Sequence, residues 1–144
     1  MRIREVLDQK GSEVVTVEPD CTVHEAMKVL VEHNIGAVVV TRDRAIVGIL
    51  TERDVLRLGA TGPEFLSSTR VADAMTSELV VGVAEDLVDY AAGIMTANRI
   101  RHLPIVEGER LAGVVSIGDI VNAMKQEKEV ENRYLRDYIQ GSVR

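Results

Sequence analysis

The sequence is poor in the residues that several kinds of function require. It has one cysteine, no tryptophan and 3% aromatic residues, and its histidines are His24, His33 and His102. One cysteine excludes a disulfide framework, and no cysteine or histidine pair has metal-ligand spacing. A thiol nucleophile at Cys21 is chemically possible but is the weaker interpretation. The scarcity of aromatic residues removes the stacking platform for single-stranded nucleic acid.

Basic residues are also in the minority. The 144 residues include 17 Lys and Arg against 23 Asp and Glu, a net charge of −6, so the clustered positive charge that binds a phosphate backbone is missing. No apolar run approaches the roughly 18 residues of a membrane span, and no secretory stretch follows residues 1–5. No nucleotide-hydrolysis, dinucleotide or metalloprotease signature is present. We expect a cytoplasmic, non-catalytic protein that binds neither nucleic acid nor membrane.

A duplication is the strongest positive feature. A shift of 65 residues aligns residues 48–54 (GILTERD) with residues 113–119 (GVVSIGD), so that a glycine, two aliphatic residues, a hydroxyl residue and an aspartate coincide. The same shift aligns the apolar faces of two predicted helices, for example Val23 with Val88. Two copies of one unit are therefore predicted.

Each unit is predicted to run strand, helix, strand, strand, helix. The ranges are strands 14–17, 37–41 and 45–50 with helices 22–33 and after Thr51, then strands 79–83, 102–106 and 110–115 with a helix 86–98. Residues 59–69 are the only convincing linker. The strands are apolar on both faces, as expected if helices cover one face and a sister sheet the other.

We therefore expect an α+β fold, with repeat 1 over 1–62, repeat 2 over 63–125 and a C-terminal helical extension over 126–144. Neither repeat is long enough to bury a core alone, so the two should pack pseudo-symmetrically against each other. The last helix should run from 117 to 139, past the globular body, because it contains no proline and a strongly helix-forming stretch.

The extension has an apolar stripe. Its members recur at helical spacing and are Val130, Tyr134, Leu135, Tyr138 and Ile139. An apolar stripe beyond the core favours self-association, with folding back onto the same chain as the alternative.

The repeated hydroxyl and aspartate have a chemical meaning. Free N–H groups at a helix N-terminus attract phosphate, and the hydroxyl of Thr51 or Ser116 can add a donor. Asp54 or Asp119, about one turn away, can accept hydrogen bonds from ribose hydroxyls. The same spacing is also an ordinary helix cap, so either copy alone can be purely structural.

Three arginines, Arg53, Arg99 and Arg101, are candidate counter-charges for a phosphate tail in this acidic chain. Solvated surface arginines are the alternative interpretation.

These features resemble the cystathionine-β-synthase (CBS) domain pair, or Bateman module, over nearly the whole chain. Units of that family are β-α-β-β-α and end in the pattern found at residues 48–54 and 113–119. Residues 16–19 (TVEP), 35–40 (IGAVVV) and 99–106 (RIRHLPIV) are also similar, and residues 3–7 and 71–76 resemble the lead-in segments of the two units. The resemblance implies a regulatory module that binds adenosine-containing ligands in two clefts between the units.

The resemblance also implies that each cleft takes its aspartate from one unit and its adenine wall from the other. It groups Thr51 and Asp54 with Val83, His102, Leu103 and Pro104, and Ser116 and Asp119 with Val17, Pro19, Gly36 and Ala37. The hydroxyls would bind phosphate, the aspartates ribose and the strand backbone the adenine edge. The two clefts differ, because Gly118 stands in the place of Arg53 and leaves more room beside Asp119.

Ligand and partner stay open at this point. AMP, ADP, ATP and NAD(H) share one adenosine, and the sequence does not rank them; no catalytic cofactor and no metal are expected. We expect a homodimer that transmits energy or redox state to a regulated protein that the sequence does not name. The competing hypothesis is a dimeric scaffold whose clefts are vestigial.

Overall fold

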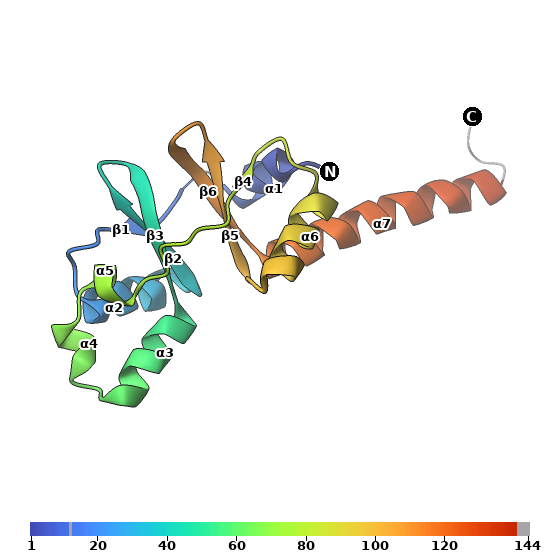
Figure 1. Cartoon of the computed structure of the whole chain (residues 1–144). Helices are drawn as coiled ribbons and strands as arrows, with labels where there is room; N and C mark the ends of the chain where they lie inside the picture. The colour runs from blue at the N-terminus through green and yellow to red at the C-terminus, as the bar shows by residue number, and fades with distance from the viewer. Residues whose placement is uncertain (12, 141–144) are drawn as a thin grey trace.

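The computed structural model describes residues 1–11 and 13–140, and it confirms the α+β fold (Figure 1). The helices are α1 (Ile3–Lys10), α2 (Val23–His33), α3 (Glu52–Thr61), α4 (Phe65–Ser68), α5 (Val71–Ala74), α6 (Val88–Asn98) and α7 (Ile117–Ile139). The strands are β1 (Thr16–Val17), β2 (Ala37–Arg42), β3 (Ala45–Thr51), β4 (Gly82–Val83), β5 (His102–Glu107) and β6 (Arg110–Ser116). Residues 141–144 of the predicted extension lie outside the described residues.

The strands are arranged in the order β1-β2-β3-β6-β5-β4. In each half a short outer strand runs parallel to its neighbour, and the two longer strands form an antiparallel hairpin. We expected the second copy to cover a face of the first sheet. The two halves instead join at their edges, where β3 and β6 share one registered pair, Ala45 with Arg110.

Most of the predicted linker over residues 59–69 is helical, which the turn-forming residues of this segment did not indicate. α3 continues to Thr61, whose hydroxyl donates to Leu58 O at 2.6 Å, and α4 follows within four residues. Gly59 does not end α3, since a glycine inside a helix costs only about 1 kcal/mol relative to alanine. α4 contacts both α2 and α3, so tertiary packing holds it in place.

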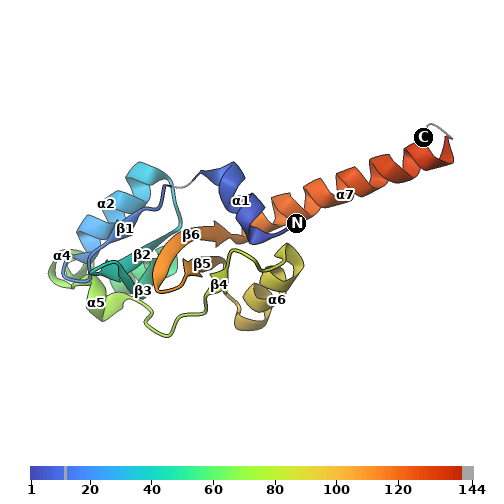
Figure 2. The same ribbon diagram turned by 90° about the horizontal axis from the view of Figure 1, so that it is seen from above.

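The lead-in helix of each unit packs on the other unit. α1 lies beside β6 and the start of α7 (Figure 2), where Ile3 N–H donates to Asp86 O at 2.9 Å. α5 packs on the first unit, where Val71 N–H donates to Cys21 O at 2.8 Å. Ile3 and Val71 are both fully buried. Each unit therefore completes its core with residues from the other unit's sequence.

Two apolar clusters result. The first contains Val17, Ala26, Leu30, Val38, Val40, Leu50 and Val71, and the second Ile3, Val6, Ala84, Val88, Ala91, Met95, Leu103, Ile105, Val115, Ile120 and Ala123. Burial of this apolar surface is the main stabilising contribution to each half.

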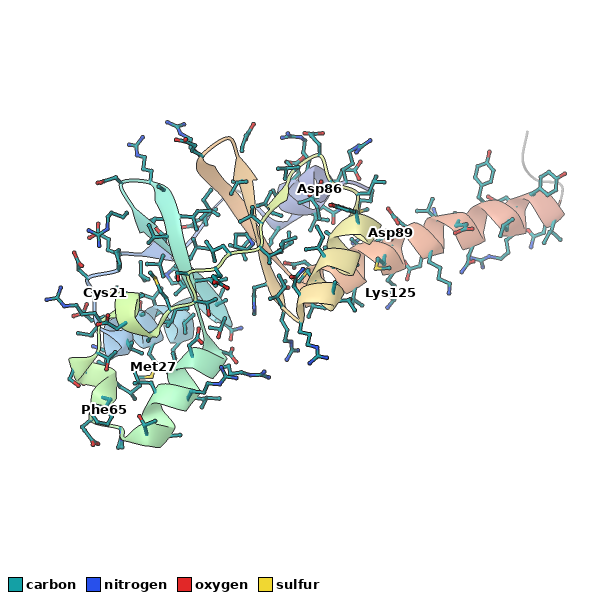
Figure 3. The ribbon with its side chains drawn as sticks, in the orientation of Figure 1. Cys21, Met27, Phe65, Asp86, Asp89 and Lys125 are labelled. Carbon is teal, nitrogen blue, oxygen red and sulfur yellow. The ribbon has the colours of Figure 1, made fainter. Side chains whose placement is uncertain are left out.

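α7 confirms the prediction of a long last helix. Its buried residues are Ile120 and Ala123, in the first two turns. Lys125 lies near the place where the helix leaves the body (Figure 3), and the next two residues, Gln126 and Glu127, still bond to Gln9 and to the amino group of Met1. Farther along, Tyr138 and Ile139 are 73% and 80% exposed. Within residues 1–11 and 13–140, no helix is both long and apolar enough to cross a membrane.

Candidate functional site

The repeated sequence forms the same local structure twice. Thr51 Oγ1 accepts from Asp54 N–H at 3.3 Å, and Asp54 Oδ2 accepts from Thr51 N–H at 3.0 Å. Ser116 and Asp119 form the corresponding bonds at 3.1 and 2.8 Å. Both helices thus begin with a reciprocal capping box, which satisfies backbone donors that would otherwise have no partner in the helix.

The glycine of the repeated sequence has a packing role. A Cβ atom on Gly113 would lie 2.6 Å from Leu7 Cδ2, and one on Gly48 would clash with the side chain of Met75. Leu7 is the last residue of the lead-in segment 3–7, and Met75 lies near the end of the lead-in segment 71–76. The glycine therefore makes room for the exchanged segment, a role that the sequence did not reveal.

A cleft of about 650 Å³ lies between the units at the starts of α3 and α7. Its lining residues come from both units and are Gly36, Ile49, Thr51, Glu52, Arg53, Leu56, Thr76, Arg99, Ile100, Arg101, His102, Ser116, Ile117 and Gly118. Thr51 and Ser116 are equivalent positions of the repeat, as are Gly36 and Arg101. Equivalent positions of the two copies thus face the same cleft.

The loops before β2 and β5 are fixed to the helix starts. Glu52 N–H donates to Gly36 O at 3.0 Å, and Ile117 N–H donates to Arg101 O at 2.8 Å. A Cβ atom on Gly36 would lie 2.9 Å from Glu52 Oε1 and 3.3 Å from the His102 ring. Gly36 therefore permits the close approach of the two units at this point.

The cleft has an excess of positive charge. Arg53, Arg99 and Arg101 line it with one acid, Glu52, and none of the three arginines forms an ion pair with a described residue. Arg99 has a left-handed backbone conformation, with φ of 55°. Burial lowers the pKa of His102, so its imidazole is neutral at pH 7. The cations in the cleft are therefore the arginines.

Half of the sequence-predicted site residues line this cleft: Gly36, Thr51, Arg53, Arg99, Arg101, His102, Ser116 and Gly118. The other half are not among its lining residues. Val17, Pro19, Ala37, Leu103 and Pro104 are buried and Val83 is exposed, while Asp54 and Asp119 are half-buried in their capping boxes. The ribose and adenine roles of this second group stay predictions.

Six lining residues were not identified from the sequence: Ile49, Glu52, Leu56, Thr76, Ile100 and Ile117. Glu52 and Ile117 directly follow the repeated hydroxyl residues Thr51 and Ser116, and this adjacency in the sequence could have identified them. No feature of the sequence pointed to Thr76, because it reaches the cleft through a β-bridge between its backbone and that of Ile49.

Asp119 has a second partner that Asp54 does not share. Lys10, at the end of α1, donates from Nζ to Asp119 Oδ2 and to Val114 O, each at 2.7 Å. Burial alone would raise the pKa of Asp119, but the hydrogen bonds from Lys10 and Ser116 outweigh it, so this pKa lies below its ordinary value. Asp119 is therefore ionised at neutral pH.

A smaller hollow of about 290 Å³ lies near the two hairpin turns. It is lined by Val14, Thr16, Thr41, Arg44, Arg110 and Leu111.

The chemistry of Cys21 and of metal ligands can also be assessed from the structure. Burial raises the pKa of Cys21, which keeps its thiol protonated at neutral pH and unsuited to nucleophilic attack. No group of three potential metal ligands gathers within residues 1–11 and 13–140.

The CBS domain model matches residues 3–60 and 71–126 of this chain. The chain belongs to the CBS domain family. Its sequence is 39% identical over 148 residues to the CBS domain-containing protein CBSX3, mitochondrial, of Arabidopsis thaliana, a match that covers 96% of this chain and 72% of that protein.

Solved structures of CBS proteins have the same fold. A CBS-domain containing protein from Agrobacterium tumefaciens superposes with a TM-score of 0.82 at 42% identity, over 86% of this chain and 99% of that one. CBSX2, solved in complex with AMP, superposes with a TM-score of 0.74 at 26% identity, over 88% of this chain and 98% of that one. The predicted arrangement as a CBS pair is thereby confirmed.

Proposed function

We propose that this CBS pair is a non-catalytic regulatory module that binds an adenosine-containing ligand, such as AMP, ADP, ATP or NAD(H), between its two units. The cleft between the units carries the proposal. Three arginines without an ion pair to any described residue meet two helix N-termini there, in a chain whose net charge is −6. Both features favour a phosphate group.

The size of the cleft supports a nucleotide. Its volume of about 650 Å³ lies within the range of roughly 300–1,000 Å³ usual for small-molecule sites. The similarity to CBSX2, which was solved with AMP, supports the adenosine part. Apolar side chains of Ile49, Leu56 and Ile100 offer a surface for a base.

The two aspartates are proposed to bind ribose. In each capping box one carboxylate oxygen, Oδ2, accepts the hydrogen bond from the backbone. No described residue donates a hydrogen bond to Oδ1 of Asp54 or Asp119. An ionised carboxylate has about four acceptor positions, so a capping role and a ribose contact are compatible.

The ligand can regulate a partner if its binding changes the angle between the two units. A ligand that contacts both sides of the cleft binds best at one angle between them, and only such a difference in affinity can shift a conformational equilibrium. A partner protein would sense that angle. The alternative, a scaffold with vestigial clefts, requires that no ligand bind.

We also propose that the protein is a homodimer formed through the apolar stripe of α7. Residues 125–131 contain more acids than bases, and residues 132–139 more bases than acids. Antiparallel pairing of two α7 helices would place opposite charges side by side along the stripe. A second copy of the chain is therefore a partner whose charges complement those along α7.

Thermal unfolding with AMP, ADP, ATP and NADH tests the proposed function. A ligand present at about 100 times its Kd should add roughly 2.7 kcal/mol to the free energy of unfolding. The variant Arg99→Ala/Arg101→Ala should bind AMP at least about tenfold more weakly, because charged hydrogen bonds contribute about 1.5–3 kcal/mol each.

Lys28→Ala/Arg57→Ala is the matched control, since it removes two positive charges from exposed positions that neither line the cleft nor lie on α7. Equal AMP affinity of the two double variants would exclude the arginine cleft as the phosphate site. No stabilisation by any of the four ligands would favour the scaffold.

A further inference from the structure

The two aspartates of the repeat have different surroundings. Asp54 Oδ2 accepts one hydrogen bond, from Thr51 N–H. Asp119 Oδ2 accepts from Ser116 N–H and also from the ammonium group of Lys10. Within the described residues, no cation forms an ion pair with Asp54. The same acid therefore occurs twice, with a fixed positive charge beside only one copy.

This difference originates in how the two lead-in segments end. The lead-in segment that packs on the first unit becomes extended after Met75, and its Thr76 exchanges backbone hydrogen bonds of 2.9 Å with Ile49. The carbonyl of Ile49 is thus satisfied by a backbone amide. Within the described residues, no hydrogen bond or ion pair joins a side chain of α5 to Asp54.

The lead-in helix that packs on the second unit, α1, continues for about one more turn than α5. Leu7 packs under Gly113 as Met75 packs under the equivalent glycine, but α1 runs on to Lys10 and ends at Gly11, whose φ of 99° suits glycine. The carbonyl of Val114, equivalent to that of Ile49, accepts from Lys10 Nζ. With two acceptors, the ammonium group is held over Asp119.

The two aspartates therefore differ in the acceptor positions that they offer to a ribose. Its two neighbouring hydroxyls donate two hydrogen bonds, best accepted by both oxygens of one carboxylate, and each oxygen has about two acceptor positions. One position on Asp54 Oδ2 is taken, whereas Ser116 and Lys10 take both on Asp119 Oδ2. A ribose can use both oxygens of Asp54 directly but must displace Lys10 to use both oxygens of Asp119.

We propose that Lys10 is a selectivity residue that weakens ribose binding at Asp119, so that the Asp54 site fills first and occupation of the Asp119 site releases the end of α1. This inference rests on the proposed function. The Lys10 and Asp119 side chains are 42% and 27% exposed, so their ion pair is weak enough for a ligand to break. The device makes two similar sites respond at different ligand concentrations.

The test uses Asp54→Ala protein, in which the Asp119 site remains. Calorimetric titration with AMP and with adenosine should show that adding Lys10→Met tightens binding of both ligands about fivefold, the size expected for a partly exposed ion pair. Lys10→Arg, which keeps the charge, should leave binding weak. Lys128→Met removes one charge from the exposed part of α7 and should have no effect.

Amide hydrogen exchange gives an independent readout. In Asp54→Ala protein, saturating AMP should speed exchange in residues 7–11, and in Asp119→Ala protein it should not. Exchange unaffected by AMP would exclude release of α1.

Two calorimetric results would overturn the inference. Unchanged affinities on Lys10→Met would show that Lys10 does not compete with ribose. Weaker AMP binding with unchanged adenosine binding would show that Lys10 binds phosphate instead. If the unaltered protein bound no AMP, the proposed function would fail and this inference with it, whereas AMP binding that is insensitive to Lys10 would remove the inference alone.

Discussion

Arg99 combines a proposed binding role with an unfavourable backbone. It caps α6 with φ of 55° and ψ of 42°, a left-handed conformation that costs most side chains about 1–2 kcal/mol relative to glycine. The equivalent residue of the first unit, Asn34, has the same conformation, which asparagine adopts more readily. Asn34 is not among the cleft-lining residues, whereas Arg99 is. Arg99 therefore keeps a charge at a position where glycine would be more stable.

Arg99→Gly should raise the free energy of unfolding by about 1 kcal/mol and weaken AMP binding, because the strain and the charge are removed together. Asn34→Gly should change stability by less and leave binding unaltered. Urea unfolding and AMP titration of both variants measure the two effects. A loss of stability in Arg99→Gly would mean that its side chain makes contacts that outweigh the strain.

The elements of each unit depend on the exchanged lead-in segments, and the glycines of β3 and β6 test that dependence. A Cβ atom on Gly48 would meet Met75 and lie 3.0 Å from the backbone carbonyl of Thr76, which cannot move freely. For a Cβ atom on Gly113, the three nearest atoms all belong to the flexible side chain of Leu7. On Gly93, in α6, no atom lies within 4 Å.

We therefore expect Gly48→Ala to lower the free energy of unfolding by about 1–3 kcal/mol through overpacking, and Gly113→Ala by less. Gly93→Ala should raise it by up to about 1 kcal/mol, because alanine favours a helix. Chemical denaturation measures the free energy of unfolding of the three variants and so ranks them. Equal effects at Gly48 and Gly93 would contradict the packing role of the segment after α5.

The sequence was sufficient to predict most of the elements because their signals are local. The 65-residue shift aligned both hairpins and both capping boxes, and α7 was predicted to its last residue at Ile139. The exchange of α1 and α5 was not predicted, since it depends on contacts between residues far apart, such as Ile3 with Asp86. α4 was also missed, because a helix of four residues is too short to show a helical periodicity in the sequence.

The site was predictable to a similar degree. The hydroxyl residues were found because the duplication placed them at helix starts in both copies. The arginines were found as candidate counter-charges in an acidic chain, since they are not repeated. Lys10 could not be found, because α1 belongs to the first repeat in sequence and acts on the second in space. Glu52 and Thr76 reach the cleft through backbone geometry, which residue types alone do not reveal.

The molecule as a whole consists of a body and a projecting helix, and the proposed dimer concerns the helix. Leu135 and Tyr138 are 53% and 73% exposed, and they lie on the apolar stripe of α7. Exposed apolar stripes of this kind are common at sites of association between proteins.

Leu135→Glu/Tyr138→Glu should convert the protein to a monomer while leaving unfolding of the body unchanged, because charges would enter the proposed interface. Light scattering coupled to size-exclusion chromatography measures the mass. Gln126→Glu/Gln140→Glu adds the same two charges at a position of α7 and at its C-cap that do not belong to the apolar stripe, and it should preserve the dimer. An unaltered mass in the first variant would remove α7 from the interface.

The crossed packing of α1 and α5 also bears on biosynthesis. As the chain leaves the ribosome, the first half must wait for Val71 before its interior closes, while Ile3 emerges early and has no place to dock until Asp86 and the strands beyond it have followed. Of the two units, the segment that carries α1 is therefore made first and is among the last parts to be fixed, and Lys10, at its end, reaches Asp119 only after β6 and the start of α7 have been translated.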